Sequence, residues 1–173
     1  MIWLRSFDEA RVQKKWITIV DETWLQTYGE EKDKYCMSRE YIKADGSKGK
    51  IWYRMALKAK IILADDLVIS FETEFIENSA VDTVEQKKMN QEQIKQDCEM
   101  KAFKRLAKRI KKDFSRLPIV VLCDSLYAGE PVFDICEKNH WSYIIQYKAG
   151  SIKSIMEEYE AMPEKGKVRR RNL

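Results

Sequence analysis

Two aspartates are the residues of this sequence best suited to chemistry, because each directly follows a short apolar run. Asp21 follows Trp16-Ile17-Thr18-Ile19-Val20, and Asp124 follows Ile119-Val120-Val121-Leu122-Cys123. Short runs rich in β-branched residues are typical of strands inside a sheet. A carboxylate is rarely placed at the end of such a strand without a partner, so each aspartate needs a physical explanation.

Two explanations are open for Asp124. Aspartate accepts hydrogen bonds from the backbone N–H groups that follow it, and it therefore often caps a turn or a helix. The alternative is that Asp124 is a metal ligand or a catalytic carboxylate that converges with a second carboxylate. Two converging carboxylates repel each other unless a proton or a cation lies between them. Mg²⁺ or Mn²⁺ takes carboxylate oxygens and keeps positions open for phosphate and water. Two such ions can activate a water or a 3′-hydroxyl for in-line displacement at phosphorus.

The hydrophobic periodicity predicts five strands and three helices. The predicted strands cover residues 16–20, 51–63, 67–75, 119–123 and 141–147, and the predicted helices cover 90–114, 130–139 and 151–162. Residues 26–50 are polar and contain turn residues. The order β-β-β-α-β-α-β-α is that of the α/β ribonuclease H-like fold, a mixed sheet with helices on both faces. In that architecture the ends of the first and fourth strands lie side by side, so Asp21 and Asp124 are expected to converge.

The length of 173 residues and the composition, 45% hydrophobic and 35% charged, indicate one globular domain. We expect an N-terminal helical segment over residues 1–15, the main domain over 16–162, and a basic tail over 163–173. The N-terminus is too charged for a signal peptide, and no apolar run is long enough to span a membrane.

Positive charge is unevenly distributed, although the net charge is only +4. The helix predicted over 90–114 carries seven basic residues, which are Lys101, Lys104, Arg105, Lys108, Arg109, Lys111 and Lys112. Such a run is common on a solvated helix face, and it also suits a polyanion. In a DNA enzyme the first five of these residues would be candidate contacts to DNA phosphates.

The cysteines and the single histidine do not indicate a further reactive site. Cys36, Cys98, Cys123 and Cys136 form no C-x-x-C pair and no zinc pattern, so we expect reduced thiols in a cytosolic protein. His140 lies between a predicted helix and a predicted strand, where a turn or packing residue is expected. A nucleophilic dyad would have no other histidine to use.

Five stretches of the chain resemble DDE-type transposases of bacterial insertion sequences, in the group with a long basic helix before the second aspartate. They are residues 20–23, 58–60, 73–78, 97–106 and 116–128. The resemblance spans about residues 15 to 160, and it implies metal-dependent cleavage and strand transfer of DNA in a bacterial cytoplasm, at the nucleoid. It further implies Asp21 and Asp124 as catalytic metal ligands and two Mg²⁺ or Mn²⁺ ions as cofactors. The implied partner is double-stranded DNA at transposon ends and target, and a homodimer is one candidate assembly.

The sequence departs from the family pattern at two points. Glu22 stands where a glycine usually follows the first aspartate, and the family's third carboxylate lies on a helix that this chain is expected to lack. Glu157, Glu158 and Glu160 are acidic residues of the last predicted helix, where a solvated face is expected, and none of them is assigned the third role. The alternatives are therefore a truncated transposase domain, a non-catalytic DNA-binding or regulatory remnant, and a self-contained ribonuclease H-like nuclease that uses one of these glutamates.

Overall fold

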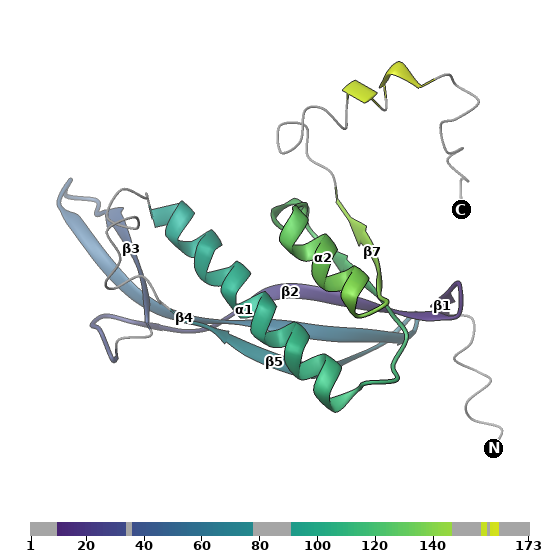
Figure 1. The fold of residues 1–173 in the computed structure, drawn as a ribbon. Coiled ribbons are helices and arrows are strands. Elements are labelled where there is room, and N and C mark those ends of the chain that lie inside the picture. The colour runs from purple at the N-terminus through teal and green to yellow at the C-terminus, as the bar shows by residue number, and fades with distance from the viewer. Residues whose placement is uncertain (1–9, 34–35, 78–90, 147–156, 159, 163–173) are drawn as a thin grey trace.

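The computed structural model of the protein describes residues 10–33, 36–77, 91–146, 157–158 and 160–162. These residues form a mixed α/β domain in which two helices pack on a seven-stranded sheet (Figure 1). The strands are β1 (Arg11–Val12), β2 (Lys15–Tyr28), β3 (Met37–Ile42), β4 (Lys48–Ala64), β5 (Leu67–Ile76), β6 (Ile119–Cys123) and β7 (Ser142–Ile145). The helices are α1 (Gln91–Asp113) and α2 (Glu130–Lys138), and a 3₁₀ turn, η3 (Ser125–Tyr127), follows β6.

The sheet is antiparallel on one side of β2 and parallel on the other. Its main path is β3-β4-β2-β6-β7, and β4 runs antiparallel to β2, β3 and β5. Strands β3 and β5 share the edge of β4 that faces away from β2, because β3 pairs with 48–53 and β5 with 55–64. Strand β6 is parallel to both β2 and β7. The five strands predicted from the sequence therefore lie in the spatial order β5-β4-β2-β6-β7.

Several predicted elements are confirmed, and two predictions about β structure are wrong. Strand β6 has the predicted bounds, and the long hairpin of β4 and β5 is present. The first predicted strand does not end at Asp21, because residues 22–28 stay paired with 52–57 of β4 across an irregularity at Leu25. Residues 26–50 contain strand β3, which its polar composition concealed. Pairing with β4 alone makes this segment a strand.

Residues 11–15 of the expected N-terminal helical segment are not helical. Arg11–Val12 pair with β2, and Gln13 and Lys14 have φ of 51° and 65°. Two consecutive positive φ angles are typical of a two-residue type I′ hairpin and are incompatible with a right-handed helix. Residues 1–9 and the basic tail 163–173 lie outside the described residues.

Both described helices pack on the same face of the sheet (Figure 1). Apolar residues of α1, among them Phe103 and Leu106, form one buried cluster with Val132 of α2 and with Leu57 and Val121 of the sheet. Burial of this cluster supplies the main driving force for folding. Of the helix expected over 151–162, only 157–158 and 160–161 are described as helical. In the part of the chain that the structure describes, the helices therefore cover one face of the sheet, and the predicted helix on the other face is not among the described elements.

Candidate functional site

The pairing of β2 with β6 brings the two predicted aspartates to the same level of the sheet. The strands are parallel, and the register runs from Trp16 opposite Ile119 to Ile19 opposite Leu122. Continued by two residues, the same register sets Asp21 beside Asp124. Neighbouring strands are about 5 Å apart, so the two backbones are close at this point. This register places the backbones of the two predicted aspartates close to each other.

Each of the two carboxylates already has one partner within the protein. Oδ1 of Asp124 accepts a hydrogen bond from the backbone N–H of Leu126 at 2.9 Å, so Asp124 does cap η3. Oδ2 of Asp21 lies 3.8 Å from Nζ of Lys60, a residue of the neighbouring strand β4. The side chain of Asp21 is 59% exposed, and Asp124 is exposed as well. The capping interpretation of Asp124 is correct, and it leaves the carboxylate accessible to solvent.

The donor set of this pair fits a hard divalent cation in part. Mg²⁺ is commonly held by one or two carboxylates together with waters and substrate phosphates, which two exposed aspartates can supply. Lys60 would compete with such a cation for Asp21. Among the described residues, no group of three or more Asp, Glu, His or Cys side chains is arranged to hold a metal ion. A third protein ligand is therefore not provided by this part of the chain.

Two further carboxylates, Glu22 of β2 and Glu99 of α1, lie on the opposite side of β2, which α1 covers. Glu22 is two residues from the buried Val20, and its Oε1 accepts a bond from Nζ of Lys95 in α1 at 2.7 Å. Glu99 of α1 is only 5% exposed, and its Oε1 accepts a 2.5 Å hydrogen bond from the hydroxyl of Tyr127 in η3. The turn that begins at Asp124 thus also supplies the partner of the buried Glu99.

The protonation of Glu99 is set by its surroundings. Burial raises the pKa of Glu99 to about 7, and the negative charge of Glu22 acts in the same direction. The Tyr127 hydrogen bond and the positive charge of Lys95 oppose this rise. The pKa of Tyr127 is raised too, first by burial and then by the charge of Glu99. Near neutral pH, Glu99 is accordingly able to hold or to release a proton.

The sequence interpretation placed Glu22 beside the first aspartate but missed the burial of Glu99 and its bond to Tyr127, although one signal was present. Glu99 precedes Phe103, Leu106 and Ile110 at helical spacing, so it occupies the apolar stripe of α1. A carboxylate at such a position is buried when the helix packs. Its partner Tyr127 comes from a distant part of the chain, which no local pattern indicates.

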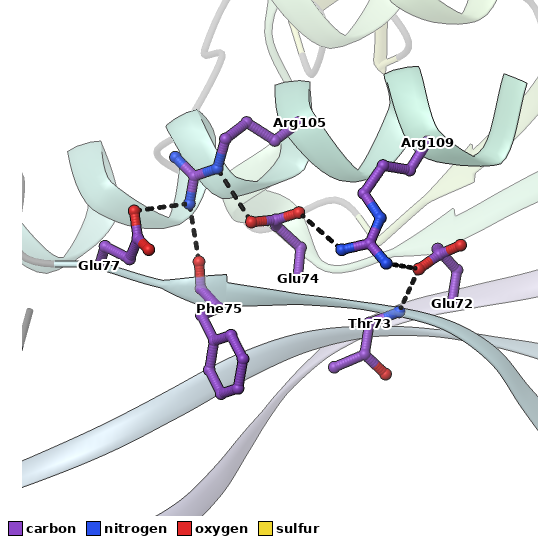
Figure 2. A network of polar contacts seen from close by, with 7 residues as sticks. All are labelled: Glu72, Thr73, Glu74, Phe75, Glu77, Arg105 and Arg109. Carbon is purple, nitrogen blue, oxygen red and sulfur yellow. Dashed lines mark hydrogen bonds and ion pairs between the residues drawn. The ribbon is translucent and has the colours of Figure 1, made fainter. Parts of the chain in front are cut away.

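The structure divides the five predicted DNA contacts of α1 into two groups. Arg105 and Arg109 point at β5, where they form ion pairs with Glu72, Glu74 and Glu77 (Figure 2). Arg109 Nη2 lies 2.7 Å from Glu72 Oε1, and Arg105 Nε lies 3.0 Å from Glu74 Oε1. The ion pairs of these two arginines stabilise the packing of α1 against the edge strand β5.

Lysines make up the other group of predicted DNA contacts. Lys104 and Lys108 are exposed, and Lys101 is half-buried. They lie on the same helix as Arg105 and Arg109 but do not take part in the ion-pair network of Figure 2. The exposed lysines are thus the predicted contacts that remain accessible to a partner.

The remaining candidates are placed as follows. Glu157, Glu158 and Glu160 are exposed, and no contact within the described residues joins them to the aspartate pair. His140 has a φ of 58° and follows Asn139, the C-cap of α2, so it is a turn residue, as predicted. All four cysteines are buried. None of the described helices is long and apolar enough to cross a membrane.

Comparison with known proteins found no relative of this chain. No family model, no curated protein and no solved structure matches the chain.

Proposed function

We propose that this chain is the catalytic domain of a DDE-type transposase, which cleaves DNA and transfers strands with the help of Mg²⁺ or Mn²⁺. One observation carries the proposal: the parallel register of β2 and β6, continued by two residues past Ile19 and Leu122, sets Asp21 level with Asp124, about a hundred residues away in sequence. Both are exposed, as ligands shared with a phosphate and with water must be.

The strand arrangement supports the same proposal. The spatial order β5-β4-β2-β6-β7, with β4 antiparallel to its neighbours, is the arrangement expected of a ribonuclease H-like sheet. A crossover through α1 separates β5 from β6, and α2 separates β6 from β7. In α/β sheets, ligands bind outside the carboxyl ends of the parallel strands, and Asp124 directly follows that end of β6.

Each residue of the pair has a distinct role in the proposal. Asp21 and Asp124 would hold the metal, which supplies charge neutralisation and a more acidic water when bound. Lys60 neutralises Asp21 in the absence of metal and would have to move aside. The Leu126 N–H fixes one oxygen of Asp124, which limits the directions available to the other. Tyr127, anchored on Glu99, holds the turn that follows Asp124.

The test is nicking of supercoiled plasmid DNA by the purified chain, with Mg²⁺ or Mn²⁺ and with EDTA. Asp124→Asn is the informative variant, because asparagine also caps turns and keeps the bond from Leu126 while the charge is lost. We expect loss of at least a hundredfold in rate for Asp124→Asn and for Asp21→Asn. The matched control is Asp66→Asn, which removes an exposed carboxylate in the β4–β5 turn and should nick like the wild type. Metal-dependent nicking that persists in Asp124→Asn would refute the proposal.

A second candidate function is DNA binding without turnover. It is favoured by the lack of any three-membered acidic group among the described residues, since two carboxylates give a metal fewer protein ligands than this chemistry commonly uses. In that case the wild type would bind DNA in a salt-sensitive manner and would not nick it with either metal. Absence of binding at low salt would exclude this second function.

A further inference from the structure

A groove of about 500 Å³ runs between α1 and α2, and Ala107 of the buried cluster contributes to its lining. Four lysines and one carboxylate supply its charged lining, and they are Lys104, Lys108, Lys111, Lys138 and Asp134. Ala107, Pro131 and Ile135 contribute apolar surface. The groove therefore carries an excess of positive charge over a largely apolar floor.

The lysines converge because of helix geometry. Lys104, Lys108 and Lys111 follow one another at steps of four and three residues, so they lie on one face of α1. Lys138 is in the last turn of α2 and faces the same groove. Like charges at this spacing repel each other, which favours an anionic occupant between the helices.

The acidic residues near α1 do not neutralise this face. Glu72, Glu74 and Glu77 are taken up by the arginines on the β5 side (Figure 2). Within the described residues, Lys104, Lys108 and Lys138 form neither an ion pair nor a hydrogen bond, and Lys111 only donates to the carbonyl of Ser115. α1 thus has a neutralised arginine side and an unneutralised lysine side.

We propose that this groove binds the phosphate backbone of double-stranded DNA, and that Lys104, Lys108, Lys111 and Lys138 provide the contacts. The proposal rests on the proposed function for the identity of the polyanion. It differs from the sequence prediction, because it leaves out Lys101, Arg105 and Arg109 and adds two lysines, Lys111 and Lys138, that were not among the five predicted contacts.

The dimensions of the lysine row suit a duplex. Lys104 and Lys111 are separated by about 10 Å along the axis of α1, at about 1.5 Å per residue. One strand of a duplex presents a phosphate about every 3.4 Å along its axis, so the row spans about three phosphates. The side-chain amide of Asn139, the one amide side chain of the lining, donates to the carbonyl of Ile135 at 2.8 Å. The groove therefore offers ammonium groups to phosphates and little that could read a base.

The test is fluorescence anisotropy with a labelled 30-base-pair duplex, in EDTA and at several salt concentrations. The double variant Lys108→Gln/Lys138→Gln removes one charge from each helix. We expect its affinity at low salt to fall about tenfold or more, and the slope of log affinity against log salt to decrease by about 2. Asp134→Asn removes the one carboxylate of the lining and should strengthen binding. Lys108→Arg/Lys138→Arg keeps both charges and should bind like the wild type.

The matched control is Lys43→Gln/Lys48→Gln, which removes two exposed charges from the β3–β4 hairpin. Urea unfolding of each variant checks that the fold is retained, which is expected because the substituted lysines are exposed. Unchanged binding in the groove variant, or an equal loss in the hairpin control, would overturn the proposal. Absence of DNA binding by the wild type would overturn it as well. EDTA excludes metal-dependent chemistry. The binding result therefore does not depend on whether the chain nicks DNA with Mg²⁺ or Mn²⁺.

Discussion

Replacing Glu99 by glutamine should change how the stability of the protein depends on pH. The folded state raises the pKa of Glu99 from its ordinary value of 4.5 to about 7, with burial as the main cause. Between these values the unfolded chain releases the proton while the folded chain keeps it. A raised carboxyl pKa therefore stabilises the fold at low pH, and this contribution is lost as the pH rises from about 4.5 to about 7.

The size of the effect follows from the shift. Each unit of difference between the two pKa values corresponds to about 1.4 kcal/mol, so Glu99 can reduce the free energy of unfolding by up to about 3 kcal/mol between pH 4.5 and pH 8. Glutamine is close in size, stays neutral, and can still accept the hydrogen bond of Tyr127 through its carbonyl oxygen. Glu99→Gln should thus be more stable than the wild type at pH 8 and similar to it at pH 4.5.

The assay is equilibrium urea unfolding of both proteins at pH 4.5, 6 and 8. Other titrating groups are common to the two proteins, so they largely cancel in the difference. A second variant, Tyr127→Phe, removes the hydrogen bond that favours the charged form of Glu99. Its loss of stability should accordingly be larger at pH 8 than at pH 4.5. If the wild type and Glu99→Gln show the same pH dependence, the assignment of the raised pKa to Glu99 is refuted.

Two further predictions concern the ion pairs between α1 and β5 and the buried thiols. Arg109→Ala leaves Glu72 and Glu74, whose side chains are only 9% and 13% exposed, with fewer partners, so urea unfolding should show a loss of about 1–3 kcal/mol. The control Lys108→Ala removes the adjacent exposed lysine and should change the free energy of unfolding by less than about 0.5 kcal/mol. Equal effects of the two substitutions would contradict a stabilising role of the Arg109 ion pairs. Burial raises the pKa of Cys123 to about 12 and that of Cys136 to about 11, so iodoacetamide at pH 8 should label them only after unfolding. Mass spectrometry measures the labelling, and rapid modification of either thiol in the native protein would disprove their burial.

The sequence predicts well the elements whose pattern is local. The unbroken apolar run at 119–123 gives β6, the helical spacing of apolar residues gives α1, and the two alternating runs around Asp65-Asp66 give the β4–β5 hairpin. Strand β3 has no such pattern, because most of its residues are polar and exposed. It is a strand only because its backbone pairs with β4, and pairing between segments is not encoded in the periodicity of either one.

The candidate site shows the same division. The sequence alone places Asp21 and Asp124 after apolar runs, and the expected order of elements is enough to bring them together. It does not determine which of two neighbouring carboxylates faces which side. Asp21 and Glu22 are adjacent in sequence, yet the alternation of side chains along β2 sends Glu22 to the α1 face, where Lys95 pairs with it. This assignment depends on where α1 packs.

The basic helix is the clearest case of what only the tertiary structure decides. Sequence determines that α1 is basic and that its lysines and arginines lie outside its apolar stripe. The packing of α1 against β5 neutralises Arg105 and Arg109, and the packing of α2 beside it gathers Lys104, Lys108, Lys111 and Lys138 along one groove. Charge is a property of each residue, whereas the partner that neutralises it or leaves it available comes from a different part of the chain.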